Sequence, residues 1–388
     1  MQIENVQGIT YAEMRPRKPI TSPPQIGGFP VYPDLVRDLC DPGFVSEEER
    51  QARALHICAV LSAWAYSDAS TLSSIMVRMG LEKNRCRQIV VANDTMFVRS
   101  TAYLIQSACG RVAFLTYRGT EPFELATWAT DADVKPVAVK PDPNGKAAVH
   151  GGFYRNQRAT WFDVVAGLQR ACSGGSILAR SGPGAITQPQ CERGTSDPGE
   201  KIAPLEGIYV TGHSLGGAMA VLAAYRMQTD GAYSAFKPRL KALYTFGQPM
   251  VGNPEFAEQC RQLDFFASRY IRCVYQRDVV PHLPPSLAGP HEHFGALLSS
   301  ETATGSSLVH WAPSGERTEQ VRSFTAILAA ATDVAIEQVP LWRDVASFAR
   351  KVPILRDSDL LYSLYDHSPT NYVACSQPPG VVSELGDF

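Results

Sequence analysis

The stretch Val210-Thr211-Gly212-His213-Ser214-Leu215-Gly216-Gly217-Ala218 decides the fold, because it joins an apolar run to a helix-forming run through a glycine-flanked serine. A strand that turns sharply into a helix needs glycines two residues before and two residues after its apex, where side chains would clash with neighbouring backbone. Such a turn exposes the Ser214 hydroxyl at the sheet edge, where the helix N-terminus favours negative charge. We therefore predict that Ser214 is a nucleophile, the alternative being a turn with a purely structural role.

Stretches typical of strands alternate with stretches typical of helices on both sides of this turn. The strand-like stretches are followed by amphipathic or buried helical ones, an order that implies parallel pairing through right-handed crossovers. The sequence therefore predicts an α/β fold with a central, mostly parallel sheet flanked by helices. The expected strands are 88–97, 102–105, 112–117, 208–210, 240–246 and 271–275, and the expected helices are 47–66, 153–172, 214–227 and 254–263.

The predicted domain organisation is one catalytic domain, 46–388, preceded by an arm, 1–45. Prolines are spaced through the arm so that no long helix can form, and we expect an extended segment lying on the core. The stretch 173–204 is rich in Gly, Ser and Pro and longer than ordinary connections, which indicates a surface insertion. The stretch 297–360 has a helical pattern and is expected to be a helical insertion or cap.

Composition excludes several classes of protein. Of 388 residues, 45% are hydrophobic and 19% are charged, which rules out a mainly disordered chain. The formal net charge of −2 lacks the electropositive field of most nucleic-acid binders, so we expect no nucleic-acid partner. Residues 1–20 contain no apolar signal region, which predicts a cytoplasmic location, with leaderless export as the alternative.

The nine cysteines are scattered and contain no C-x-x-C pair. Neither a zinc site nor a disulfide framework is indicated, and free thiols in a reducing compartment fit this pattern better.

A serine nucleophile needs a histidine base and a carboxylate that orients the base. Asp278 directly follows the expected strand 271–275, at the carboxyl edge where such sheets place their chemistry. His367 follows the apolar run 360–365 and precedes a proline-containing turn, which suits a mobile catalytic loop. The residues alone leave the choice of base open among the histidines downstream of Asp278, which are His282, His291, His293, His310 and His367.

An ordered set of segments between about 46 and 372 resembles the class 3, fungal lipase-like family of the α/β-hydrolase superfamily. The resemblance implies an α/β-hydrolase fold with cap or lid insertions and a catalytic triad of Ser214, Asp278 and His367. It implies a lipid or ester substrate and no metal or organic cofactor. The segments are the serine turn quoted above, Tyr117-Arg118-Gly119-Thr120, His150-Gly151-Gly152-Phe153, Thr245-Phe246-Gly247-Gln248-Pro249, Arg277-Asp278-Val279-Val280-Pro281-His282-Leu283-Pro284-Pro285 and Asp366-His367-Ser368.

The same resemblance implies an oxyanion hole made by the backbone N–H groups of Thr120 and Leu215. It also implies a short lid after Thr120, where Phe123, Leu125 and Trp128 are apolar residues in an expected loop. We predict that these three residues cover an acyl-binding cleft, the alternative being that they pack inward as core.

His291 and His293 match a structural histidine segment of the family, although either could instead be the base.

These features together predict a serine carboxylic-ester hydrolase, a lipase that cleaves acylglycerol or related lipid esters through an acyl-enzyme. Peripheral contact with a lipid interface is expected. One alternative is a phospholipase A1-type enzyme, including an exported effector, and another is a non-catalytic binding module on a hydrolase fold. Acyl chain length, head-group preference and oligomeric state are left open by the sequence.

Overall fold

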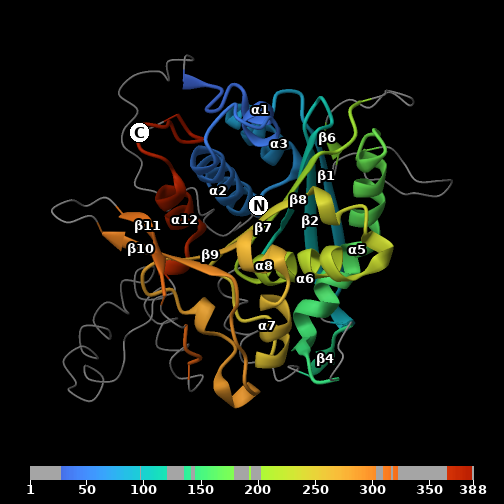
Figure 1. Ribbon diagram of the computed structural model, residues 1–388, viewed down its shortest axis with the longest axis vertical. Helices are drawn as coiled ribbons and strands as arrows, with labels where there is room; N and C mark the ends of the chain where they lie inside the picture. Colours follow the sequence, from blue (N-terminus) through green and yellow to red (C-terminus); the bar gives the residue numbers. More distant parts are fainter. Residues whose placement is uncertain are drawn as a thin grey trace, which may run out of the picture.

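A nine-stranded sheet forms the centre of the molecule (Figure 1), in the order β11-β10-β9-β8-β7-β3-β2-β1-β6. Strands β3, β7, β8, β9 and β10 are parallel, and antiparallel strands extend the sheet on both sides. The mostly parallel sheet predicted from the sequence is thus confirmed. The strands of this sheet are β1 (Arg85–Asn93), β2 (Val98–Gln106), β3 (Val112–Tyr117), β6 (Glu192–Arg193), β7 (Gly207–His213), β8 (Leu240–Phe246), β9 (Tyr270–Val274), β10 (Ala296–Thr302) and β11 (Val309–Ser314).

The computed structural model describes most of the chain around this sheet. The residues described are 28–96, 98–119, 135–140, 145–178, 192–193, 202–302, 309–315, 318–321 and 365–386. Thr120 and the predicted lid residues Phe123, Leu125 and Trp128 lie outside them, as does most of the predicted helical insertion.

Helices cover both faces of the sheet, as the two buried hydrophobic clusters and Figure 1 show. One face carries α1 (Leu35–Cys40), α2 (Glu47–Trp64), α3 (Ala69–Met79) and α12 (Pro369–Ser376). The other face carries α5 (Gly151–Cys172), α6 (Leu215–Thr229), α7 (Pro254–Arg261) and α8 (Asp264–Ser268).

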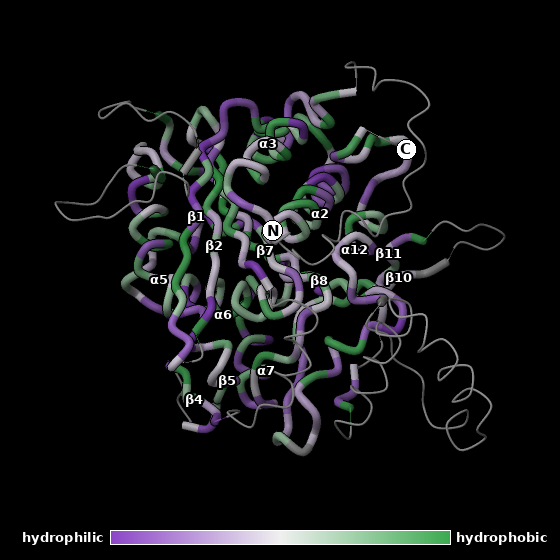
Figure 2. The backbone as a smooth tube through the Cα atoms, turned by 180° about the vertical axis from the view of Figure 1, so that it is seen from behind, coloured by the Kyte–Doolittle hydropathy of each residue, from purple (hydrophilic) through white to green (hydrophobic). Residues whose placement is uncertain are grey.

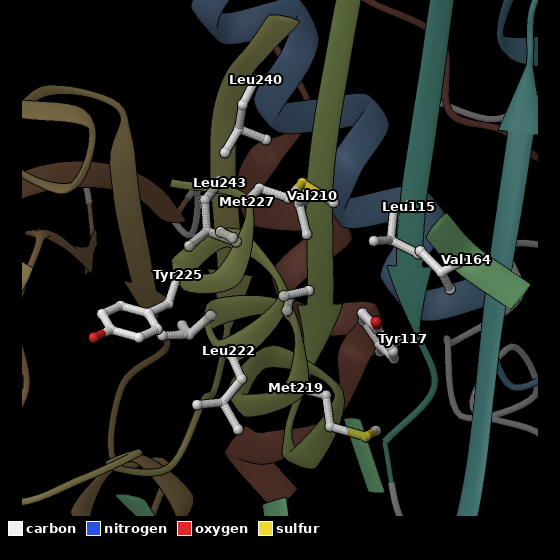
Figure 3. Close-up of a cluster of buried hydrophobic side chains, with 14 of the residues drawn as sticks. Leu115, Tyr117, Val164, Val210, Met219, Leu222, Tyr225, Met227, Leu240 and Leu243 are labelled. Atoms are coloured by element: carbon white, nitrogen blue, oxygen red, sulfur yellow. The ribbon is translucent and has the colours of Figure 1, made fainter. Parts of the chain in front are cut away.

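Side chains of the central strands alternate between the two clusters, as the two-residue period of a strand requires. Ile208 and Val210 of β7 pack on the α6 side, whereas Tyr209 between them packs on the α2 side. Figure 3 shows the α6 side, where Val210 and Leu115 of the sheet belong to the same buried cluster as Leu222 and Met219 of α6. Burial on both faces explains why β3 and the stretch Ile208–Val210 of β7 are apolar at successive positions.

Two further strands, β4 (Pro136–Ala138) and β5 (Ala148–His150), pair antiparallel in a separate small sheet. This sheet and α7 lie at the end of the molecule opposite α3 (Figures 1 and 2).

Helix α2 (Glu47–Trp64) begins at a capping box formed by Ser46 and Glu49. The Ser46 hydroxyl accepts a hydrogen bond from the Glu49 N–H at 3.1 Å, and the Ser46 N–H donates to Glu49 Oε2 at 3.1 Å. These bonds satisfy two backbone N–H groups that would otherwise lack partners at a helix start.

The prediction of a helical segment starting at 297 is wrong for the part that the structure describes. Strand β10 extends the sheet by parallel pairing with β9, and β11 pairs antiparallel with β10. Leu298 and Trp311 pack against the hydrophobic cluster on the α2 side, so pairing and burial decide the conformation of this stretch. The helical pattern that motivated the prediction lies mainly in 322–364, outside the described residues.

Residues 28–45, the described end of the predicted arm, are part of the hydrophobic core and do not form an extended segment lying on its surface. They include α1, and Tyr32, Leu35 and Leu39 are buried in the cluster that contains α2. Within the predicted surface insertion, Glu192–Arg193 adds a two-residue strand to the β1 edge of the sheet.

In the residues that the structure describes, no helix combines the length and the apolar character needed to cross a membrane.

Candidate active site

The predicted nucleophile, Ser214, lies at the apex of the turn from β7 into α6. Its backbone has φ 59° and ψ −134°, a region that costs a non-glycine residue about 1–3 kcal/mol. The flanking glycines permit this turn, because a Cβ at Gly212 would lie 2.3 Å from the Gly216 carbonyl oxygen. A Cβ at Gly216 would lie 2.1 Å from the backbone oxygen of Tyr117 on the neighbouring strand. The Gly-x-Ser-x-Gly pattern is therefore a steric requirement of this fold.

The residue that follows Ser214 provides a backbone hydrogen-bond donor for a negative charge. Leu215 is the first residue of α6, and such a residue has no carbonyl acceptor within its own helix. On the other side, the turn at Arg118 and Gly119 packs on the nucleophile, since a Cβ at Gly119 would lie 3.0 Å from the Ser214 Cβ. Thr120, predicted as the second oxyanion donor, is the next residue and lies just beyond the described segment.

Asp278 and His367 form a buried pair. Asp278 lies in the loop after β9 and has no exposed surface, and His367 is 3% exposed. The His367 Nδ1–H donates to Asp278 Oδ2 at 2.7 Å, and the Val280 N–H donates to Oδ1 at 2.8 Å. A proton on Nδ1 leaves Nε2 of the neutral ring as a lone-pair acceptor.

A glycine after β8 brings this pair next to the nucleophile. The Ser214 N–H donates to the Phe246 carbonyl at 2.9 Å, and the following residue is Gly247, with φ +58°. A Cβ at Gly247 would lie 2.6 Å from Asp278 Oδ2 and 2.8 Å from His367 Nδ1. The predicted Ser214, Asp278 and His367 therefore meet at the carboxyl ends of β7, β8 and β9, where α/β sheets place their sites.

The two atoms between which a proton would move are not engaged elsewhere. Ser214 Oγ and His367 Nε2 are both buried, and neither has a hydrogen-bond partner among the described residues. Catalytic hydrogen bonds often tighten only when substrate is bound. Ser214 has no exposed surface in this structure.

Short helical elements surround His367, whereas the sequence suggested a proline-containing turn after it. His367 ends a short 3-10 helix, η9 (Tyr365–His367), and two residues later α12 begins with Pro369 at its first position. Proline suits this position because its fixed φ matches the helix and its missing N–H is not needed there. Tyr372 and Val373 then anchor α12 in the cluster on the α2 side.

Three of the other histidines considered as the base bond to backbone carbonyls, and the fourth lies exposed on a strand. The ring of His293 is buried and bonds through Nε2 to the Pro281 carbonyl at 2.8 Å. Burial, and secondarily the guanidinium of Arg272, hold the pKa of His293 well below its usual value. His282 and His291 bond to the carbonyls of Glu319 and Gly289, and His310 lies exposed on β11.

Two residues that the sequence did not single out complete the surroundings of His367. The Tyr372 hydroxyl donates to Asp278 Oδ2 at 2.5 Å. His213 Nε2 lies 2.8 Å from the His367 carbonyl oxygen. His213 directly precedes Ser214 in the Gly-x-Ser-x-Gly motif, and this position could have indicated a role beside the nucleophile. No motif or spacing in the sequence indicated a role for Tyr372.

Within the described ranges, no group of three or more His, Cys, Asp or Glu side chains is placed to hold a metal ion.

The sequence around this site is similar to that of known lipases. Residues 200–288, which contain the serine turn and Asp278, match the family described as lipase (class 3). The triacylglycerol lipase OBL1 of Ricinus communis is 30% identical over 206 residues, which cover 47% of this chain and 37% of that protein. The protein of the same name from Arabidopsis thaliana is 28% identical over 280 residues, covering 67% of this chain and 52% of that one. The chain thus spans about half, or less, of the length of these curated relatives.

A solved structure, a Rhizomucor miehei lipase propeptide complex, matches the fold with a TM-score of 0.52 and 21% identity, covering 85% of this chain and 82% of that one. The likeness identifies the architecture as an α/β-hydrolase fold.

Proposed function

Since this chain is related to the class 3, fungal lipase-like family, we propose that it is a serine carboxylic-ester hydrolase, a lipase that cleaves acylglycerol or related lipid esters. One observation carries the proposal: Asp278 fixes the His367 ring so that Nε2 is the free acceptor, close to the strained Ser214 turn.

In the proposed acylation step, Ser214 Oγ attacks the ester carbonyl carbon while His367 Nε2 accepts the hydroxyl proton. The carbonyl π electrons move onto oxygen, where the Leu215 and Thr120 N–H groups stabilise the negative charge. The tetrahedral intermediate then collapses, and the C–O bond to the alcohol breaks as His367 returns its proton to the leaving oxygen. The product of this step is an acyl-enzyme on Ser214.

Deacylation repeats these movements with water in place of the serine. His367 Nε2 takes a proton from water, and the resulting oxygen nucleophile attacks the acyl carbon. Collapse of the second tetrahedral intermediate returns the proton to Ser214 Oγ and releases the fatty acid. Apart from water and the ester, the proposed steps use side chains and backbone groups of this chain.

The role of Asp278 in this proposal is to stabilise the imidazolium that His367 becomes in both steps. The carboxylate is buried, and its two oxygens accept hydrogen bonds from His367, Val280 and Tyr372. A buried carboxylate held by fixed donors keeps its direction, which preorganises the site for the positive charge that develops on the ring.

For the substrate, we propose neutral acylglycerols at a lipid–water interface. The support is the name of the relatives, triacylglycerol lipase, together with the burial of Ser214, which must become accessible before an ester can react. Phospholipid is the competing substrate class, and it enters the test below as a separate outcome.

The test is hydrolysis of p-nitrophenyl esters from butyrate to palmitate, and of triolein and phosphatidylcholine, by the wild type and Ser214→Ala. We expect Ser214→Ala to lose roughly 10⁴-fold or more in kcat. Ser268→Ala, which removes an exposed hydroxyl on α8, is the matched control and keeps full activity. Full activity of Ser214→Ala on every ester refutes the mechanism, and release of fatty acid from phosphatidylcholine alone moves the substrate to phospholipids.

A further inference from the structure

The side chain of His213 lies between Tyr66 and the catalytic histidine of the proposed mechanism. Tyr66, which follows α2, places its hydroxyl 2.9 Å from His213 Nδ1. On the other side of the ring, His213 Nε2 lies 2.8 Å from the His367 carbonyl oxygen. We propose that Tyr66 and His213 are positioning residues that hold His367 in place for proton transfer, an inference that rests on the proposed function.

The direction of each hydrogen bond in this chain follows from its acceptors. A backbone carbonyl only accepts, so His213 Nε2 must carry a proton and donate it to His367. In the neutral ring, Nδ1 is then the acceptor and takes the Tyr66 O–H. The Tyr66 hydroxyl therefore selects the only neutral tautomer of His213 that can hold the His367 backbone.

Tyr66 also contacts the turn on the oxyanion side of the nucleophile. A Cβ at Gly119 would lie 2.3 Å from the Tyr66 hydroxyl oxygen and 2.6 Å from the His213 carbonyl oxygen. The Arg118 guanidinium lies 5.7 Å from the centre of the Tyr66 ring. The Tyr66 side chain thus contacts both the turn at Arg118 and Gly119 and the His213 ring that bonds to His367.

The electrostatics of the site require that His213 stay neutral. Its ring lies 4.4 Å from the His367 ring, centre to centre, at an angle of 34°. A positive charge on His213 would oppose the imidazolium that must form on His367. Burial, and secondarily the nearby His367, hold the pKa of His213 well below its usual value.

The other groups that face the His213 ring are consistent with a neutral state. Among the described residues they include the hydroxyl of Tyr66 and the phenol of Tyr372, whose ring centre lies 5.6 Å away. Asp278, the nearby acid, accepts from His367 and Tyr372. His213 is therefore a neutral donor in the described site.

The kinetic test compares Tyr66→Phe with Tyr32→Phe, a matched control. Tyr32 makes the same type of bond, from its hydroxyl to His56 Nδ1 at 2.8 Å, between the segment before α1 and the middle of α2. We expect both variants to lose similar thermal stability, because each leaves one buried imidazole nitrogen without its tyrosine. Tyr66→Phe alone should lower kcat, by roughly 3–30-fold with KM unchanged, because positioning acts on the transition state.

A second measurement, long-range proton–nitrogen NMR of the histidine rings, requires no activity. The wild type should show His213 as the Nε2–H tautomer with no titration near the ordinary histidine pKa of about 6.5, and Tyr66→Phe should populate the Nδ1–H tautomer. A wild-type His213 that titrates near pH 6.5 or carries its proton on Nδ1 overturns the proposal.

The two proposals fail in different ways. A wild type that hydrolyses no ester refutes the hydrolase function. An active wild type whose Tyr66→Phe variant has the same kcat as Tyr32→Phe refutes the positioning role and leaves the hydrolase function intact.

Discussion

The hydroxyl of Tyr372 lies 2.5 Å from Asp278 Oδ2, the same carboxylate oxygen that accepts the His367 Nδ1–H. This phenol also accepts the Tyr275 N–H at 3.2 Å, at the end of β9. Burial, and secondarily the Asp278 charge, hold the pKa of Tyr372 well above its usual value, so the phenol stays protonated and donates. Helix α12 is thereby attached to the carboxylate that orients the base.

Removing this hydroxyl should weaken both stability and activity. We expect Tyr372→Phe to lose about 1.5–3 kcal/mol of unfolding free energy, as for hydrogen bonds to charged groups, and roughly tenfold in kcat. The measurements are urea unfolding at pH 7 and ester hydrolysis. Tyr209→Phe is the control, because its buried hydroxyl bonds to the Leu39 carbonyl at 3.4 Å, away from Asp278. Equal activity of the two variants would show that the Tyr372 bond does not assist Asp278.

A methyl group at Gly247 should disable the site with a limited effect on folding. It would enter the space held by Asp278 Oδ2 and His367 Nδ1, at 2.6 and 2.8 Å, on a backbone with φ +58°. We expect Gly247→Ala to lose at least about 10²-fold in kcat, the order that small misplacements in a catalytic site cause.

Gly380→Ala separates backbone strain from this clash. Gly380 has φ +75°, and a Cβ there meets nothing within 4 Å. Both variants should lose about 1 kcal/mol of stability from strain, measured by urea unfolding, and only Gly247→Ala should lose activity. An active Gly247→Ala would mean that Asp278 and His367 do not need their described positions.

The buried histidines predict instability on the acid side. Burial lowers the pKa of His213 and His293 in the folded state, whereas the unfolded chain titrates near 6.5. A lowered folded pKa contributes stability above the unfolded value, and that stability is lost as pH falls below about 6.5 toward the folded pKa. Unfolding free energies at pH 7.5 to 4.5 should therefore decrease, and His293→Gln should reduce the slope, whereas His310→Gln, on an exposed side chain, should not. Equal slopes in all three proteins would contradict this origin of acid sensitivity.

The parts of the site that the sequence predicted are those with a local steric or topological cause. The glycines around Ser214 mark the turn because backbone atoms of Gly216 and Tyr117 fill the space of any side chain. Asp278 was found because the end of a parallel strand is a defined place in this fold. These requirements leave a pattern within a few residues of the functional group.

Other parts of the site depend on contacts between distant segments and leave no such pattern. Tyr66 and His213 are 147 residues apart, and Tyr372 and Asp278 are 94 apart, so only the assembled fold brings each pair together. Strand β10 was missed for a related reason, because its conformation follows from pairing with β9. Long-range pairing and burial override local propensity in such segments.

The identity of the base can be tested by the rate at which an alkyl fluorophosphonate labels Ser214. Labelling requires an activated hydroxyl, and the bond from His367 Nδ1 to Asp278 leaves Nε2 as the free acceptor. We expect His367→Ala to slow labelling by at least about 10³-fold, because the serine loses its base. His293→Ala removes the bond to the Pro281 carbonyl in the loop after Asp278, so it should lower stability and slow labelling less than tenfold. If His293→Ala abolished labelling while His367→Ala retained it, the base would be His293. Asp278 would then have to break its hydrogen bond to His367 and orient His293 instead.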